Sequence, residues 1–322
     1  NGYPEVSEST RARVVAAARA AEYTPNARAR RLATGRSMTI GHVIPLSGKH
    51  EQVNPIFGDF IVGAGEVYAR EGYDLLLSMI PVEDFETAYR KLAANGAVDA
   101  VMVQAPQADD ARIGILTELG LPFLVHGRAG PGAYSYLDIA NVRAFRRATD
   151  LLLDLGHRRI ALINGPELLD FAARRRRGME EALAARGLAA NPAWMRSGLM
   201  TEGDAYDQAL AMLGATPRPT AFLAASIIQA IGIRRAVDDA GLTLARDVSL
   251  VCHDDVLSYL GNVAGARGGP PITATRSSIR AAGARCAEII IDLIRNPDQA
   301  PVQELWEVEL VIGRSTGPVP AV

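Results

Sequence analysis

Two charged side chains in the sequence follow predicted strands and could bind a polar ligand there. Arg175 follows an apolar run at 159–164 and the loop after it, and Asp254 comes just after an apolar run at 248–252. A planar guanidinium can donate to two adjacent hydroxyls, and a carboxylate can accept from two. Both side chains are therefore able to bind a polar ligand through hydrogen bonds. The alternative for Arg175 is a solvated helix face, because residues 174–177 are all arginine.

The sequence gives little support for a metal site or a nucleotide-binding site. His253 beside Asp254 is compatible with a metal phosphohydrolase, but such a site needs several more histidines, and the others are scattered along the chain: His42, His50, His126 and His157. The sequence has no Walker loop, no Gly-x-Gly-x-x-Gly after its first predicted strand and no paired zinc motif. We expect a protein that is not an enzyme and that uses no metal or cofactor.

Charge is unevenly distributed along the chain. Residues 1–37 carry seven arginines and three glutamates, a local charge of +4, whereas the whole chain carries −2. The remainder therefore sums to −6, because −2 minus +4 is −6. A basic N-terminal arm on an acidic body is typical of a protein that binds a polyanion. The alternative is a solvated charged helix.

From Met38 onward, predicted strands alternate with predicted helices. This alternation predicts parallel sheets flanked by helices, which must position the charged side chains. Apolar runs predict strands at 39–44, 73–79, 98–103, 122–126, 159–164, 220–224, 248–252 and 307–312. Amphipathic stretches predict helices at 56–71, 85–95, 110–119, 141–155, 172–186, 202–213, 228–240 and 277–294. These strand–helix units are too many to form a single sheet readily. The sequence predicts an α/β fold of two doubly wound parallel-sheet lobes, with a ligand cleft between their strand ends.

The N-terminal segment is predicted to be helical but has little to pack against. Ser7 can cap a helix that runs to about Glu22, and Tyr23-Thr24-Pro25 ends it. A second short helical stretch covers 26–33. Because a lone helix of this length is marginal in water, we expect the sequence to begin partway through a small helical domain.

The two cysteines, Cys252 and Cys286, lie in apolar segments far apart in the sequence. A disulfide framework is therefore not expected, and a reducing cytoplasm fits. No apolar run approaches the roughly 20 residues needed to span a bilayer, and residues 1–10 do not resemble a signal peptide. We expect a cytoplasmic protein with no membrane partner.

Several segments, in order, resemble the lactose/galactose repressor (LacI/GalR) family of transcriptional regulators. They are residues 6–14, 23–32, 54–57, 156–161, 175–178, 247–255 and 309–315. Each segment alone is weakly specific, but together they span essentially the whole chain. The resemblance implies the C-terminal helix of an incomplete helix-turn-helix headpiece at 1–25 and a hinge helix and linker at 26–37. It also implies two lobes like those of periplasmic sugar-binding proteins, an N-terminal lobe at 38–138 plus 277–304 and a C-terminal lobe at 139–276 plus 305–322.

The hinge helix implied by the resemblance would bind DNA directly. Family hinge helices pair across a dimer in the minor groove, where a leucine wedges a base step open, and Leu32 matches that leucine. Such wedges unstack and bend DNA. Ala29 and Ala33 are small enough for close approach, and Asn26 and Arg28 can reach the groove edge or the phosphates. The alternative for Leu32 is simple packing.

The resemblance also assigns effector contacts. Arg175 and Asp254 match contacts of the family, and weaker candidates lie at strand ends, near the inter-lobe crossover or at the start of the first long core helix: Gln104, His126, Met200, Tyr136, Asp138, Asn54 and Phe57. His126 is equally compatible with a satisfied structural role. The sequence departs from the family at Ser226-Ile227-Ile228, where an amide or carboxylate pair is usual. Ser226 can still donate one hydrogen bond, so we expect the effector to bind differently on that wall.

The resemblance thus implies a homodimeric repressor of carbohydrate metabolism that binds operator DNA. A small sugar effector, for which a short α-glucoside is the favoured candidate, would move the lobes and separate the hinge pair. Purine and sugar-phosphate effectors remain open. The alternative function is a free sugar-binding protein of the periplasmic type, which would not need the basic arm.

Overall fold

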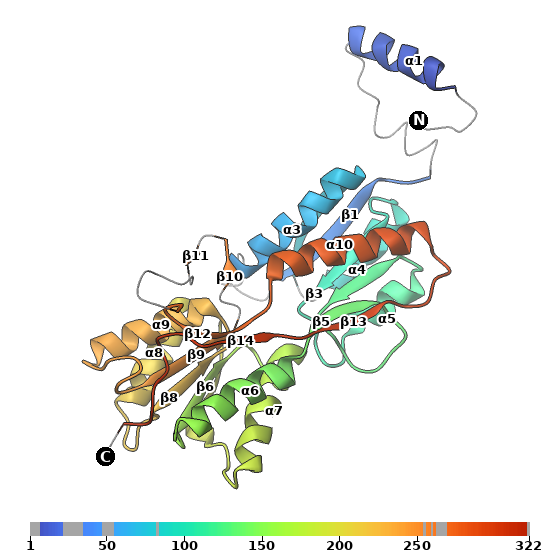
Figure 1. Cartoon of the computed structure of the whole chain (residues 1–322). Helices are drawn as coiled ribbons and strands as arrows, with labels where there is room; N and C mark the ends of the chain where they lie inside the picture. The colour runs from blue at the N-terminus through green and yellow to red at the C-terminus, as the bar shows by residue number, and fades with distance from the viewer. Residues whose placement is uncertain are drawn as a thin grey trace.

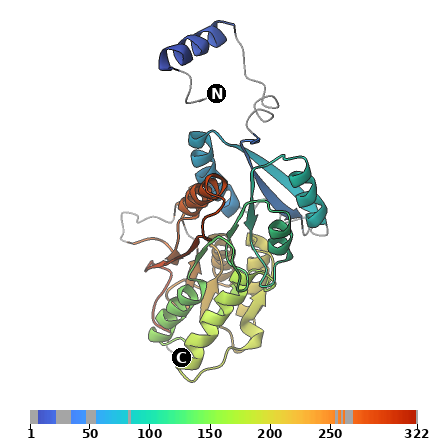
Figure 2. The same cartoon turned by 90° about the vertical axis from the view of Figure 1, so that its right-hand side faces the viewer.

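The computed structural model describes residues 7–21, 35–46, 55–81, 84–253, 256–258, 260–261 and 269–320. Within these residues it forms two lobes, one beyond the other, each built on a six-stranded sheet (Figures 1 and 2). The predicted two-lobed α/β fold is confirmed. Helix α1 (Glu8–Ala20) is drawn apart from both lobes in the two views. The Thr10 N–H donates to Ser7 Oγ at 3.3 Å, as expected of a helix cap.

The described sheet of the N-terminal lobe is parallel throughout. Its order is β13-β5-β4-β3-β1-β2. These strands are β1 (Thr39–Leu46), β2 (Asp74–Pro81), β3 (Ala100–Gln104), β4 (Phe123–His126), β5 (Tyr136–Ile139) and β13 (Gln303–Trp306). Helices α3 (Pro55–Glu71), α4 (Phe85–Ala94), α5 (Ala111–Glu118) and α10 (Ile279–Arg295) pack on it, with α3 and α10 side by side (Figure 1).

The described sheet of the C-terminal lobe repeats this plan with one difference. Its order is β14-β12-β9-β8-β6-β7, and the edge strand β14 runs antiparallel to β12, whereas the sequence predicted parallel strands only. The strands are β6 (Ile160–Asn164), β7 (Met195–Ser197), β8 (Ala221–Ala224), β9 (Ser249–His253), β12 (Thr273–Arg276) and β14 (Glu309–Val311). The helices are α6 (Asn141–Asp154), α7 (Asp170–Ala185), η2 (Pro192–Trp194), α8 (Glu202–Leu213) and α9 (Ile227–Asp239). A short pair, β10 (Val256–Leu257) and β11 (Leu260–Gly261), follows β9.

The apolar runs in the sequence are continuous, rather than alternating with polar residues, because they form the central strands of the sheets. Strands β6 and β9 are buried along their whole length, as expected where helices cover both faces of a parallel sheet. The strand ends are therefore held by packing on two sides. Polar residues that follow such strands are positioned rigidly at the sheet edge.

Within the described residues the chain passes between the lobes at three places. These are the β5–α6, β12–α10 and β13–β14 connections, because β5 and β13 belong to one sheet and β12 and β14 to the other. Each connection is short, so the three segments form a hinge between the lobes. Residues on the first two connections also reach the cavity described below.

Close helix pairing in each lobe depends on glycine. A Cβ added to Gly178 on α7 would lie 2.2 Å from the carbonyl oxygen of Val142 on α6. A Cβ added to Gly283 on α10 would lie 2.1 Å from the carbonyl oxygen of Phe60 on α3. Both distances are far below van der Waals contact, so these two positions admit no side chain at the observed helix separation.

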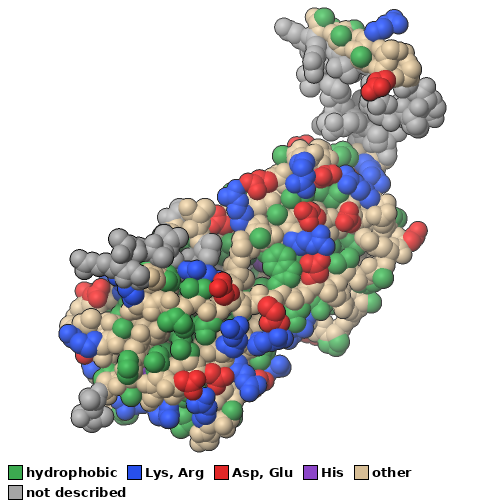
Figure 3. All heavy atoms as spheres, viewed as in Figure 1, with side chains coloured by type: hydrophobic (Ala, Val, Ile, Leu, Met, Phe, Trp, Pro, Cys, Tyr) green, Lys and Arg blue, Asp and Glu red, His purple; other side chains and the backbone are tan. Residues whose placement is uncertain are grey.

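Charged side chains of both signs are intermixed over both lobes on the face shown in Figure 3. Many form exposed ion pairs between neighbouring turns, such as that of Arg177 with Glu181. The acidic excess of the body is therefore not gathered into one patch on this face. No helix among the described residues is long and apolar enough to cross a membrane.

Candidate functional site

A cavity of about 180 Å³ lies between the two lobes. The N-terminal lobe contributes residues after strands β3 and β4 and the first turns of α3, and the C-terminal lobe contributes α7 and the loops after β7 and β8. Ser277 lies in one of the hinge connections, and Ile139, Asn141 and Ile279 are the strand or helix residues that border them. The cavity therefore adjoins the hinge and the carboxyl ends of parallel strands, where ligands bind in doubly wound folds.

A chain of polar contacts crosses from one lobe to the other along this cavity. Asp138 on β5 accepts a hydrogen bond from Asn141 Nδ2 at 3.2 Å. Asn141 Oδ1 in turn accepts from Arg175 Nε at 2.8 Å, and Arg175 Nη1 donates to the carbonyl oxygen of Ala225 at 2.8 Å. The Arg175 guanidinium also lies over the Phe171 and Phe145 rings, 4.7 and 5.4 Å from their centroids.

Arg175 differs from the arginines beside it. It is only 5% exposed, whereas the side chain of Arg177 is 61% exposed and pairs with Glu181. Arg176 pairs with Glu167 and Glu180. The interpretation of the arginine run as a solvated face is therefore wrong for Arg175 and right for Arg177.

Besides Arg128 Nε, two polar atoms of cavity-lining residues are buried without a hydrogen-bond partner among the described residues. They are the donor Gln104 Nε2 and the acceptor Asp138 Oδ2. Arg128 Nε lies 3.3 Å from Asp138 Oδ2, close enough for an ion pair but without hydrogen-bond geometry. A buried polar group without a partner costs about 1–3 kcal/mol. Both atoms are thus available to a ligand that can donate and accept, as a hydroxyl does.

Burial raises the pKa of Asp138 above its usual range. The backbone N–H of Ile139 and the charges of Arg128 and Arg174 oppose this shift by favouring the carboxylate. A ligand hydroxyl that donates to Oδ2 acts in the same direction as these groups. Ligand binding through such a hydroxyl is therefore expected to lower the pKa of Asp138.

Aromatic and sulfur-containing side chains form the apolar part of the cavity wall. The rings of Phe57 and Phe60 are parallel, with centroids 6.5 Å apart, and Phe60 lies 4.5 Å from the His126 ring. Phe171 and Met200 face them from the other lobe. Flat apolar walls combined with a few fixed polar groups are typical of sites for small ligands.

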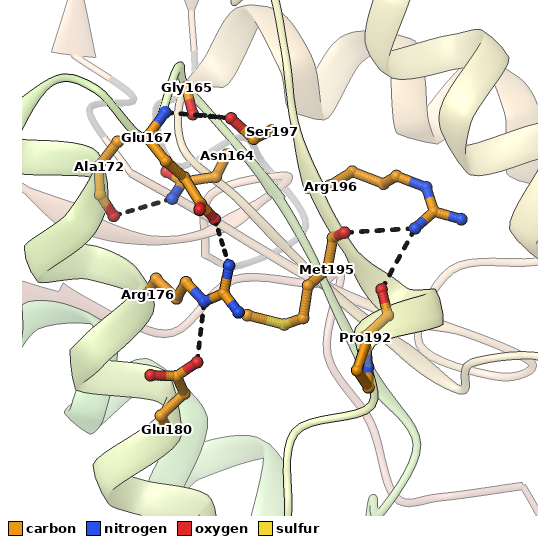
Figure 4. Close-up of polar contacts among 10 residues, drawn as sticks. All are labelled: Asn164, Gly165, Glu167, Ala172, Arg176, Glu180, Pro192, Met195, Arg196 and Ser197. Carbon is orange, nitrogen blue, oxygen red and sulfur yellow. Dashed lines mark hydrogen bonds and ion pairs between the residues drawn. The ribbon is translucent and has the colours of Figure 1, made fainter.

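The loop between β6 and α7, which leads into the helix that carries Phe171 and Arg175, is hydrogen-bonded to its surroundings (Figure 4). Ser197 Oγ donates to the Gly165 carbonyl at 3.0 Å and accepts from the Glu167 N–H at 3.1 Å. Asn164 Nδ2 donates to the carbonyl of Ala172 in the first turn of α7 at 2.9 Å. The start of α7 is therefore held from two sides.

Six of the predicted effector contacts line the cavity: Arg175, Gln104, Phe57, His126, Asp138 and Met200. The structure places two others differently. Ser226 is fully buried as the N-cap of α9, where its Oγ accepts from the Gln229 N–H at 3.2 Å, and its neighbour Ala225 lines the cavity. The Tyr136 ring lies beside Tyr134 and Arg128.

The other predicted residues lie outside the described part of the chain. They are Asn54 and Asp254 for the effector and, for DNA, Asn26, Arg28, Ala29, Leu32 and Ala33. His253 is described and fully buried, with Nδ1 2.8 Å from Thr275 Oγ1. The described residues contain no group of three or more histidines, cysteines or carboxylates that could hold a metal ion.

Sequence reasoning missed Arg128, Asn141, Phe60 and Phe171. The signals for three of them were present but weak. Arg128 lies two residues beyond the predicted end of β4, and Phe171 precedes Arg175 by four residues, which places both on one helix face. Asn141 begins a predicted helix, but its role depends on β5, which the sequence did not reveal.

Comparisons with known proteins agree with this geometry. Residues 149–316 match the family described as periplasmic binding protein-like domain. The HTH-type transcriptional regulator AglR of Rhizobium meliloti (strain 1021) is 45% identical over 323 residues, covering 99% of this chain and 89% of that protein.

Two solved structures add to this likeness. A CelR–cellobiose complex has a TM-score of 0.75 at 26% identity and covers 98% of this chain and 93% of that one. A lac repressor dimer bound to operator and the anti-inducer ONPF has a TM-score of 0.81 at 25% identity, covering 97% and 92%.

Proposed function

This chain belongs to the LacI/GalR family of transcriptional regulators, and from that premise we propose that it is a repressor controlled by a small sugar bound between its lobes. The observation that carries the proposal is the inter-lobe cavity. It combines a buried guanidinium and parallel aromatic rings with an amide donor and a carboxylate oxygen that have no hydrogen-bond partner among the described residues, the oxygen lying at ion-pair distance from Arg128. This set suits a ligand with many hydroxyls and an apolar face.

Arg175, Gln104 and Asp138 are the proposed polar contacts of the effector. Phe57, His126 and Met200 provide the surface against which its ring packs. Asp254 and Asn54 are proposed as further contacts by family likeness. The effector class is a short oligosaccharide, with an α-glucoside as first candidate. The relative CelR, whose structure holds cellobiose, supports a disaccharide-sized ligand.

The DNA-binding role is proposed for residues 26–33 in a homodimer. Leu32 would wedge a base step, with Ala29 and Ala33 at the contact between hinge helices and Asn26 and Arg28 at the groove. Support comes from the +4 charge of the arm and from the likeness to a repressor dimer on its operator. The protein would therefore act in the cytoplasm, on DNA, without catalysing a reaction.

A carbohydrate panel tests the effector. Purified protein is heated with maltose, trehalose, sucrose, cellobiose, glucose 6-phosphate and hypoxanthine, each at 5 mM, which is about 100 times a Kd of 50 μM. A ligand at 100 times its Kd stabilises by about 2.7 kcal/mol, which raises the Tm by several degrees. A shift with an α-glucoside supports the proposal. A shift with hypoxanthine or glucose 6-phosphate alone would overturn the sugar assignment.

A further inference from the structure

Within the described part of the chain, both hydrogen-bond donors to one carboxylate of the N-terminal lobe come from the C-terminal lobe. Asp59 lies on α3, and Ser258 lies beside β10 in the segment after β9. The Ser258 N–H donates to Asp59 Oδ2 at 2.7 Å, and the Ser258 hydroxyl donates to Oδ1 at 2.5 Å. Asp59 is 4% exposed. Among the described residues no ion pair involves it, so these two donors are its main compensation for burial.

The energetic asymmetry of this contact is large. A buried carboxylate that loses its donors retains the desolvation cost, which exceeds the 1–3 kcal/mol of a neutral group. Separation of the lobes removes both donors at once. Because Ser258 is itself exposed, water replaces these donors as the lobes separate, and the preference is the difference between the two charge-assisted hydrogen bonds and that hydration. The pair therefore favours the arrangement in which the lobes are together.

Asp59 lies between two residues that line the cavity, Phe57 and Phe60. The same helix is closely packed on α10 through Gly283, and α10 contributes Ile279 and Ala282 to the cavity. A change in lobe arrangement at Ser258 is thus transmitted directly to the aromatic wall of the site.

The N-terminal lobe is in turn fixed to the arm. Asp99 Oδ1 accepts from the Ser37 N–H and hydroxyl at 2.6 and 2.8 Å, and Asp99 Oδ2 accepts from the Met38 N–H at 2.9 Å. Arg36 Nη2 donates to the Ile294 carbonyl at the end of α10 at 3.5 Å. Residues 36–38 therefore move with the N-terminal lobe.

A second inter-lobe contact uses backbone atoms only. The Asp170 N–H donates to the Pro106 carbonyl at 3.0 Å, and Gln107 forms an antiparallel bridge with Leu169. This contact is independent of side-chain identity. Of the two, the Asp59–Ser258 contact is the one that a side-chain substitution can remove selectively.

We propose that Asp59 is a positioning residue that clamps the lobes together through Ser258 and so couples effector binding to the DNA-binding arm. The coupling to DNA rests on the proposed function, whereas the clamp itself does not. Loss of the clamp shifts the free protein toward separated lobes. Effector affinity falls because binding must then supply the closure, and the fold of each lobe is unaffected.

The isosteric substitution Asp59→Asn tests the clamp. It replaces the carboxylate by a neutral amide, whose oxygen can accept from the Ser258 N–H and whose NH₂ can donate to the Ser258 hydroxyl. Both contacts then lose their charge-assisted strength, which is roughly half of the bond energy. Ser258→Ala removes only the hydroxyl bond. Glu66→Gln is the matched control, because Glu66 is on the same helix, 57% exposed, and pairs with Arg280 on the neighbouring helix.

The lobe separation is measured without any effector. Dyes are attached to Arg90→Cys on α4 and Arg234→Cys on α9, which are 46% and 61% exposed; Cys252 and Cys286 are buried and do not compete. Energy transfer between the two dyes falls as the lobes separate. We expect Asp59→Asn to lower this energy transfer, Ser258→Ala to lower it less, and Glu66→Gln to leave it unchanged. The double variant should match Asp59→Asn. Unchanged transfer in Asp59→Asn overturns the clamp, whether or not any sugar binds.

Effector affinity is then measured by calorimetry with the sugar that shifts the Tm of the unmodified protein most. Asp59→Asn should weaken binding about tenfold while the Tm without sugar stays within a few degrees of that of Glu66→Gln. A lowered Tm with unchanged affinity and energy transfer would show that Asp59 is only a packing residue. If no sugar of the panel binds, the proposed function fails and the clamp is still decided by energy transfer.

Discussion

Arg175 Nε donates a 2.8 Å hydrogen bond to Asn141 Oδ1, and this bond joins the α7 helix of one lobe to the connection that leads into the other. Asn141 also donates to Asp138, so a single amide orients both charged groups at the cavity. The guanidinium is further held by the Ala225 carbonyl and two aromatic rings. The polar side of the site is thus ordered before a ligand arrives, which reduces the entropy cost of binding.

Arg175→Lys should weaken effector binding by at least tenfold. A lysine has no planar fork and cannot donate to Asn141, the Ala225 carbonyl and a ligand hydroxyl with the same geometry. Arg177→Lys, on the exposed face of the same helix, is the control and should bind normally. Calorimetric titration gives both affinities, and equal affinity of the two variants would remove Arg175 from the site.

Gln104→Met should lower the affinity for the effector without lowering the stability of the free protein. Its buried Nε2 has no hydrogen-bond partner among the described residues, so methionine of similar shape removes an uncompensated donor. We expect the free energy of unfolding without ligand to stay the same or rise by up to about 1–3 kcal/mol. Effector affinity should fall about tenfold. Urea unfolding and calorimetry measure the two quantities, and a destabilised variant with full affinity would contradict the assignment.

Gly178→Ala should destabilise the C-terminal lobe by about 1–3 kcal/mol, the usual cost of overpacking. The added Cβ would lie 2.2 Å from the Val142 carbonyl oxygen, so α6 and α7 must separate. Gly65→Ala on α3 is the control, because a Cβ there meets nothing within 4 Å. That variant should gain about 0.5–1 kcal/mol from helix propensity. Urea unfolding that ranks the two variants in the opposite order would contradict the packing argument.

Acidification should reduce stability through His42. Burial, with a smaller contribution from the nearby His126, lowers its pKa from 6.5 to about 3. Below pH 6.5 the unfolded chain therefore binds a proton that the folded chain does not, so stability is complete above pH 6.5 and falls as the pH drops toward 3. The loss is at most about 1.4 kcal/mol per pH unit.

His42→Gln isolates this contribution. Glutamine can keep a hydrogen bond to the Tyr68 hydroxyl, which lies 2.9 Å from His42 Nε2, but it does not titrate. The decrease in unfolding free energy between pH 6.5 and 5.5 should be smaller in His42→Gln than in the unmodified protein. His157, whose pKa burial also lowers, contributes equally to both proteins. Identical slopes would show that His42 does not govern the acid response.

The sequence predicted the central elements well because their signals are local. Continuous apolar runs such as 160–163 become strands buried on both faces. Strands β5 and β13 escaped prediction for a physical reason. Each has four residues, mixes polar with apolar side chains, and pairs with a partner more than 160 residues away. Nothing in either segment alone specifies that pairing.

The same limit applies to the site. Arg175 and Asp138 were predicted, whereas Asn141, which links them, was missed because its position depends on β5. Ser226 was assigned to the effector wall, but a serine directly before a helix satisfies the first backbone N–H groups. Its hydroxyl is used by Gln229 N–H. Local capping chemistry therefore outweighed the position of Ser226 near the cavity.

The most direct test of the central claim measures DNA binding with and without the effector. A site selected from a random DNA pool by the full-length protein is labelled, and fluorescence anisotropy gives its affinity at 150 mM salt beside that of unselected DNA. The account predicts binding at least about 10³ times tighter to the selected site, and at least tenfold weaker binding to it at saturating sugar. Equal affinity for both DNAs, or an affinity that no sugar of the panel changes, would contradict it.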